Sequence, residues 1–85
     1  MKPHHRYELR NRIERVYSRG AVQIDRDDLL SWFECQRITV NVWREIYNMW
    51  HEISGDDHDE LLMWEGDGFY QFICVAGFTP ISDRI

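Results

Sequence analysis

The spacing of apolar residues changes once along this chain, and that change limits the folds the chain can adopt. Up to about residue 55, apolar side chains recur every three or four positions, as in amphipathic helices. From residue 61 they form two extended runs, LLMW and FYQFICVA, separated by EGDG. Such runs around a glycine-containing turn predict a β-hairpin. The sequence therefore predicts an α+β domain with its helices first and a hairpin at the C-terminal end.

The first twenty residues predict one amphipathic helix. The segment RYELRNRIERVYSRG has helical spacing, and Gly20 provides a C-terminal stop. The AVQI segment that follows is short, β-prone and succeeded by polar residues, so we expect a brief strand there. The apolar stripe of the helix consists of Leu9, Ile13, Val16 and Tyr17.

A second, short helix is predicted after this strand. Asp25 can act as its N-cap, and Asp28 lies three residues later, where a capping box has its second acid. The helix should reach about Glu34. Its large apolar residues, Trp32 and Phe33, are expected in the core.

A third and longer helix is predicted after a tight connection over residues 35–38. Thr39 is its expected N-cap, Ile53 its last residue, and Gly55 its stop. Its apolar residues spread over more than half of the helix circumference, whereas a one-sided surface helix needs a stripe only slightly wider than about 100°.

The predicted order of helix, strand, helix, tight turn, helix and hairpin resembles the winged helix-turn-helix family. The resemblance covers about residues 5–76 of a single domain spanning residues 1–85, and it depends on element order. It implies a small winged-helix-like domain. The small residue that usually separates the two central helices is not obvious, which leaves their crossing angle open. Residues 77–85 form a tail that we expect to fold back onto the body.

Charge is distributed unevenly along the chain. Residues 1–20 carry six basic and two acidic side chains, a balance of +4, and residues 21–85 carry four basic and thirteen acidic ones, a balance of −9. Together these give the net charge of −5. Proteins that bind duplex DNA gain most of their nonspecific affinity by neutralising phosphates, so a −9 body opposes that task. A basic protein surface would be attracted to it.

The resemblance implies a DNA-reading role for the polar face of the third helix. Asn41, Arg44 and Asn48 would be the base-contacting residues, since Asn pairs with adenine and Arg with guanine. The favoured explanation of this face is nevertheless the solvated side of an amphipathic helix, with DNA readout second. Glu45 and Glu52 border it and oppose insertion into a DNA groove. The phosphate contacts would come from the first helix, through Arg12, Arg15 and Arg19.

The aromatic residues exceed what one small core requires. Trp43 and Tyr47 extend the apolar arc of the third helix, and they are either buried under neighbouring elements or exposed as anchors of an interface. The segment FYQFICVA is apolar on both of its faces, unlike a strand with one solvated side. Homodimerisation through the hairpin and tail is therefore a further expectation.

Several kinds of chemistry lack support in the sequence. The four histidines and two cysteines have no zinc-ligand spacing, the DDHDE segment lacks the calcium-loop pattern, and neither a phosphate-binding glycine loop nor a nucleophile motif is present. We expect no cofactor, no metal, no enzyme activity and reduced cysteines. No segment is apolar enough for a membrane span or a signal peptide, which predicts a soluble cytoplasmic protein.

Two functional classes remain. The first is an acidic protein-binding module that docks on a basic surface of a larger protein, such as a nucleic-acid-binding groove, and blocks it. The chain is similar in composition, though not in any motif, to phage-encoded anti-CRISPR inhibitors, which would place it in a host cytoplasm. The second class is a dimeric, sequence-specific DNA-binding regulator. The partner-binding residues of the first class would be Asp56, Asp57, Asp59, Glu60, Glu65 and Asp67, with Trp43 and Tyr47 as anchors.

Overall fold

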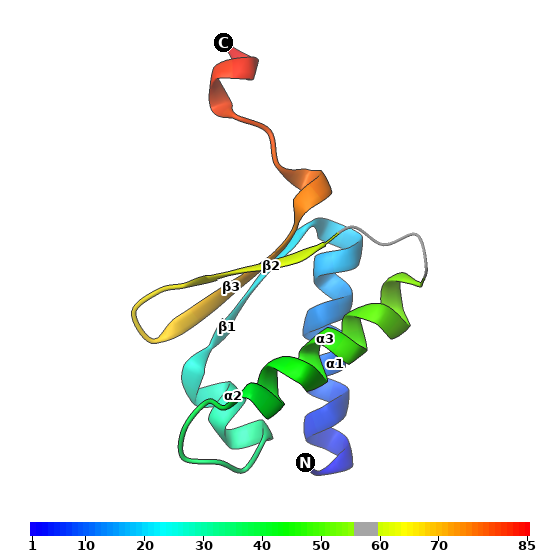
Figure 1. Ribbon diagram of the computed structural model, residues 1–85, viewed down its shortest axis with the longest axis vertical. Helices are drawn as coiled ribbons and strands as arrows, with labels where there is room; N and C mark the ends of the chain where they lie inside the picture. Colours follow the sequence, from blue (N-terminus) through cyan, green and yellow to red (C-terminus); the bar gives the residue numbers. More distant parts are fainter. Residues whose placement is uncertain (56–59) are drawn as a thin grey trace.

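The computed structural model describes residues 1–55 and 60–85. Helix α1 (Pro3–Arg19) leads into strand β1 (Ala21–Asp25), which is followed by helices α2 (Arg26–Trp32) and α3 (Val40–Ser54). Strands β2 (Leu61–Glu65) and β3 (Phe69–Cys74) form the hairpin. The predicted α+β class, with three helices followed by a hairpin, is confirmed (Figure 1).

Helix α1 begins three residues earlier than the sequence pattern indicates, with Pro3 in the first turn, where a proline ring is tolerated. It ends at Gly20, whose φ of 95° lies in the left-handed region that favours glycine and whose N–H donates to the Val16 carbonyl at 2.8 Å. Leu9, Ile13 and Val16 are buried as predicted. Tyr17 is exposed, and its ring lies at the border of the stripe, 6.1 Å from that of Trp50.

The helix α2 region differs from the prediction in two respects. Asp25 and Thr39 do precede α2 and α3, but neither side chain makes a capping hydrogen bond, so the predicted capping box is wrong. The helix also ends at Trp32 instead of Glu34. Glu34 has a φ of 53°, so the left-handed residue of this connection is not a glycine. This explains why no small turn residue is evident in the sequence.

The three strands form one antiparallel sheet in the order β1-β3-β2. Tyr70 pairs with Ile24 and Glu65, and Phe72 pairs with Val22 and Met63, so these side chains share one face. On that face Ile24, Tyr70 and Phe72 are buried. The helices therefore cover one face of the sheet, and β1 and β2 are its two edges.

One hydrophobic core joins the helices to the covered face of the sheet. Trp50 and Phe72 are its largest fully buried side chains. Trp32 is buried as predicted, whereas Phe33 is only half-buried, because it follows the end of α2 and packs against the border of the core. Fully burying side chains of this size stabilises a domain by about 1.5–3 kcal/mol each.

The prediction that residues 77–85 fold back onto the body is wrong. Two short 3-10 turns, Val75–Gly77 and Ile81–Arg84, are joined by extended backbone through Pro80. Figure 1 shows the tail running away from the sheet, and Ile81 keeps 77% of its surface exposed. Pro80 is itself extended, with φ of −60° and ψ of 137°, and it has no N–H with which to bond back to the body.

Candidate functional site

The polar face of α3 is open to solvent. Asn41, Arg44 and Asn48 are all exposed, and their spacing places them in one row along the helix. We call these three residues the polar row. The structure therefore brings the three predicted base-contacting residues together, as their sequence spacing requires.

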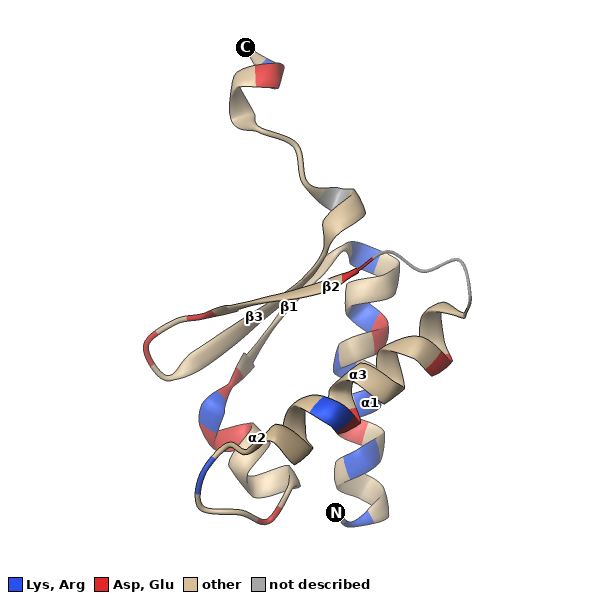
Figure 2. Cartoon of the chain, viewed as in Figure 1, with Lys and Arg blue, Asp and Glu red and all other residues tan. Residues whose placement is uncertain are grey.

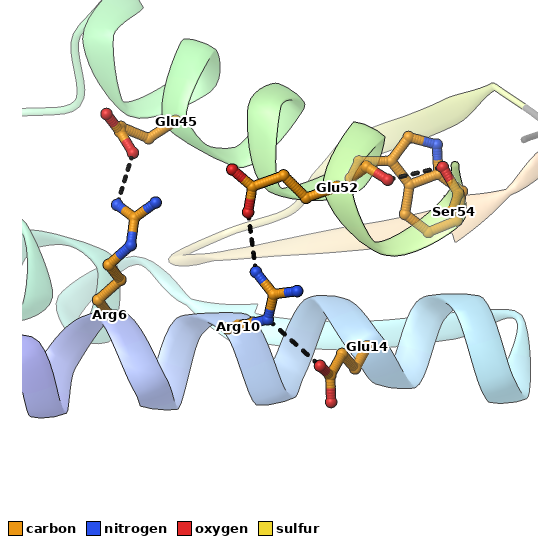
Figure 3. A network of polar contacts seen from close by, with 7 residues as sticks. Arg6, Arg10, Glu14, Glu45, Glu52 and Ser54 are labelled. Atoms are coloured by element: carbon orange, nitrogen blue, oxygen red, sulfur yellow. Dashed lines mark hydrogen bonds and ion pairs between the residues drawn. The ribbon is translucent and has the colours of Figure 1, made fainter. Parts of the chain in front are cut away.

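The acids beside this row are engaged with α1 (Figure 3). Arg6 Nη1 donates to Glu45 Oε2 at 3.1 Å, and Arg10 Nη1 donates to Glu52 Oε2 at 2.9 Å. Arg10 also pairs with Glu14 within α1, with 3.4 Å between Nε and Oε1. The negative charge that the sequence places against the polar row is thus balanced by cations of the same chain.

The stripe of Arg12, Arg15 and Arg19 lies on a different side of α1. Arg6 and Arg10 turn towards α3, and helical geometry puts the stripe about half a turn away from them. Arg12 lies over the Trp32 ring of α2, with 5.7 Å between the guanidinium carbon and the ring centroid. The stripe and the polar row therefore do not form one continuous surface.

An apolar groove opens between α3 and the edge strand β2. Its volume is about 180 Å³, and Tyr47 and Met63 keep 58% and 43% of their surfaces exposed at its mouth. The half-buried Trp43 ring contacts the sheet, with its centroid 5.1 Å from that of Tyr70. The α3–β2 groove, as we name it, is lined by Trp43, Ile46, Tyr47, Leu61, Met63 and Phe72.

Carboxylates lie at both ends of β2. Glu60 directly precedes the strand, Glu65 is its last residue, and Asp67 lies in the hairpin turn; all three are exposed. Asp56, Asp57 and Asp59 are outside the described residues. Within the described part of the chain, the predicted acidic carriers are therefore split between the two ends of the groove instead of forming one cluster.

Glu65 also acts on the hydroxyl of Tyr70, a buried residue of the sheet. Burial raises the pKa of Tyr70 above its usual value of 10.0. The negative charge of Glu65 raises this pKa further, and so does a hydrogen bond to the Glu65 carboxylate, whereas the positive charge of Arg26 lowers it. Tyr70 lies directly across from Glu65 in the hairpin and packs against Trp43. The carboxylate at this end of β2 is therefore held beside the groove wall.

Three further acids, for which the sequence predicts no binding role, lie together with Glu65 and Asp67 at the hairpin-turn end of the sheet. The Arg26 N–H donates to the Gly68 carbonyl at 2.9 Å, and Asp25 pairs with Phe69. These contacts bring the start of α2, with its two first-turn acids, to the same end as the hairpin turn (Figure 2). The acids gathered there are Asp25, Asp27, Asp28, Glu65 and Asp67.

The face of the sheet turned away from the helices carries further apolar side chains. Leu62 pairs with Ile73 on that face, and the Trp64 and Phe69 rings lie 5.6 Å apart. Phe78 lies beside Ile73 and Ala21 at a shallow pocket and is exposed. Beyond Phe78 the tail does not cover this face, and the prediction of a homodimer through the hairpin and tail stays a prediction.

Over residues 1–55 and 60–85, no group of three or more His, Cys, Asp or Glu side chains is arranged to hold a metal ion. Cys35 and Cys74 are not joined in a disulfide. Within these ranges none of the helices combines the length and apolar character that crossing a bilayer requires.

Comparisons of this chain with protein-family models, characterised proteins and solved structures found no match.

Proposed function

We propose that this chain is a non-enzymatic protein-binding module that docks on a basic surface of a larger protein and inhibits that protein by covering the surface. The observation that carries the proposal is the α3–β2 groove, in which exposed apolar side chains lie between carboxylates at both ends of β2. The groove gives a partner apolar anchorage, and the carboxylates select a partner with positive charge around its anchor.

The size of the groove favours a protein side chain over a small ligand. Small-molecule sites typically enclose about 300–1,000 Å³, whereas the groove holds about 180 Å³. Its mouth is formed by Tyr47 and Met63, and its wall by Trp43. Tyrosine and tryptophan side chains are enriched among the residues that dominate binding energies at protein interfaces. A large apolar side chain of a partner, inserted beside Tyr47, fits this lining.

Long-range attraction supports the same assignment. The chain carries a net charge of −5, and Glu60 and Glu65 bring part of it to the groove. Asp56, Asp57 and Asp59 belong to the proposal on sequence grounds, because they directly precede Glu60. Charge complementarity of this kind raises the association rate and weakens as salt screens it.

The test is a binding measurement on the partner recovered from the native host. The double variant Glu60→Lys/Glu65→Lys should slow association at low salt by about ten-fold or more, since steering acts on the on-rate. The control Glu8→Lys/Asp83→Lys makes the same charge change at exposed positions away from the groove. Equal effects of the two double variants, with unchanged melting temperatures, would contradict a docking site at the groove.

The fold proposed for this module is the winged-helix arrangement. The support is the element order, together with a short β1 that joins the C-terminal hairpin in one antiparallel sheet. The proposed target is a nucleic-acid-binding protein in the cytoplasm of a host cell. This part of the proposal follows from the compositional similarity to phage-encoded inhibitors.

A second candidate function is sequence-specific DNA binding by a dimer. One observation favours it: Glu45 and Glu52 are occupied by Arg6 and Arg10, so the polar row presents Arg44 without uncompensated acids at its side. It ranks second because the hairpin turn beside β2 is acidic, and because the stripe of Arg12, Arg15 and Arg19 lies on another side of α1. Salt-sensitive binding to one duplex, lost in Arg44→Ala, would favour this function.

A further inference from the structure

The free edge of β2 has a backbone pattern that can be read from two hydrogen bonds. The Gly66 N–H donates to the Phe69 carbonyl at 2.9 Å, and the Val75 N–H donates to the Glu60 carbonyl at 3.2 Å. Bonded residues alternate along an antiparallel pair, so Glu60, Leu62, Trp64 and Gly66 turn their backbone groups towards β3. The residues between them, Leu61, Met63 and Glu65, turn theirs away from the sheet.

These same three residues direct their side chains to the helix-covered face. Leu61 and Met63 line the α3–β2 groove, and Glu65 lies across from Tyr70. The outward backbone groups and the apolar groove therefore lie side by side along one edge. Proteins commonly protect such edges with lysine, proline or a bulge. The segment LLMWE contains neither residue, and its register against β3 is unbroken.

We infer that this edge receives an extended segment of the partner as a fourth strand of the sheet. The inference rests on the proposed function and specifies how the groove is used. Backbone groups of the segment bond to Leu61, Met63 and Glu65, and its alternate side chains enter the groove beside Tyr47. The chemistry of the edge calls for a segment with apolar residues across from Leu61 and Met63 and basic residues across from Glu60 and Glu65.

Charge favours such a segment over a second copy of this chain. In the fullest antiparallel pairing of two β2 strands, centred on Met63, Glu65 of one copy lies opposite Leu61 of the other and next to its Glu60. These two glutamate side chains point to opposite faces of the sheet, so the repulsion between two copies comes mainly from the net charge of −5 that each copy carries. A basic segment in the same place meets opposite charge at both ends.

The test uses a short peptide, long enough to span β2, that places valine across from Leu61 and Met63 and lysine at its other positions, and residue-resolved amide exchange measured by NMR. The amides of Leu61, Met63 and Glu65 should exchange at least ten-fold more slowly with the peptide bound. Those of Leu62 and Trp64, already bonded to β3, should change little. A peptide N-methylated at every second residue, on the edge that would face β2, should lose this effect.

Two proline variants provide the matched comparison. Met63→Pro removes an outward N–H that β3 does not use, and prolines are tolerated at such edge positions; it should weaken the peptide at least ten-fold. At the other edge, the Cys74 N–H donates to the Gly20 carbonyl, so by the same alternation the Gln23 N–H of β1 points away from the sheet. Gln23→Pro removes this N–H and should leave binding of the peptide unchanged. Melting temperatures confirm that both variants fold, and the N-methylated peptide gives the same contrast without altering the protein.

The outcomes separate this inference from the proposed function. If no edge amide is protected, or if Met63→Pro binds the peptide as well as the unmodified protein does, strand addition is overturned. If the natural partner is then still lost in Tyr47→Ala, the groove function stands without it. Concentration-dependent protection of the edge amides in the protein alone would mean that a second copy occupies the edge, which also overturns the inference. If Tyr47→Ala leaves the natural partner bound, the proposed function itself fails.

Discussion

Helix α3 meets the rest of the molecule differently on its two sides. Towards α1 it presents Glu45 and Glu52, and each of these acids is paired with an arginine of the same chain. Towards β2 it presents Trp43 and Tyr47, which leave an apolar groove open to solvent. The acids on the charged side are paired within the chain, whereas the groove on the apolar side is open to solvent. The surface of α3 that is still available to a partner is therefore the apolar one, although the sequence composition draws attention to the charged residues.

The largest expected effect separates two tryptophans of this one helix. Trp50 is 1% exposed in the core, and Trp43 is half-buried at the groove. Trp50→Ala should lower the free energy of unfolding by about 3–5 kcal/mol, as for other large buried side chains, and can unfold a domain of this size. Trp43→Ala should cost clearly less, because less of its surface leaves water on folding.

Chemical denaturation of both variants checks this contrast. Equal losses of stability in Trp50→Ala and Trp43→Ala would mean that the groove side of α3 is packed as tightly as the core side. The proposed difference between a packed core side and an open groove side of α3 would then be contradicted.

A smaller effect is expected on the charged side. The four side chains of the pairs Arg6–Glu45 and Arg10–Glu52 keep between 40% and 54% of their surface exposed, so solvent screens both pairs. Glu45→Gln and Glu52→Gln should each lower stability by about 1 kcal/mol or less, and the loss should shrink as salt is added. Thermal melts at two salt concentrations measure this, with Glu8→Gln as the control. A large loss that salt does not reduce would show that these pairs hold α1 and α3 together.

The smallest effect concerns Tyr70, at the junction of core and groove. Its raised pKa means that the folded state disfavours the ionised phenol. The resulting contribution to stability is fully present below pH 10.0, the ordinary tyrosine value, and is lost as pH rises from there through the folded-state pKa. Alkaline melts should therefore show a decline that is weaker in Tyr70→Phe than in the unmodified protein. Identical declines would place the Tyr70 hydroxyl in water.

The elements were predictable because they depend on local patterns. The helical period, Gly20 and the EGDG turn are enough to place the α1 stop and the hairpin. The prediction for the end of α2 was wrong because Glu34 adopts a left-handed conformation, which is uncommon for residues other than glycine and is not signalled by the sequence. The tail was misplaced because the apolar content of Phe78 and Ile81 suggested burial, although extended backbone carries Ile81 away from the sheet.

The candidate site was predictable only in part. Trp43 and Tyr47 stood out as more apolar surface than one helix side needs, and the structure puts both at the groove. Leu61 and Met63 could not be assigned to it, because their meeting with α3 depends on how the helix crosses the sheet. The partners of Glu45 and Glu52 depend likewise on the crossing of α1 and α3. The one signal for them in the sequence was that Arg6 and Arg10 share one face of α1, about one turn apart, and Glu45 and Glu52 share one face of α3, about two turns apart.

The most direct test of the central claim uses two neighbouring residues of α3. Tyr47 lines the groove, and Asn48 belongs to the polar row; both are exposed, so replacing either should change stability by only about 0.5 kcal/mol or less. The measurement is the affinity of Tyr47→Ala and Asn48→Ala for the macromolecule recovered with this protein from its native host. We predict that Tyr47→Ala loses at least ten-fold in affinity for a basic protein, while Asn48→Ala binds it normally. Recovery of DNA, with affinity lost in Asn48→Ala and kept in Tyr47→Ala, would contradict the account.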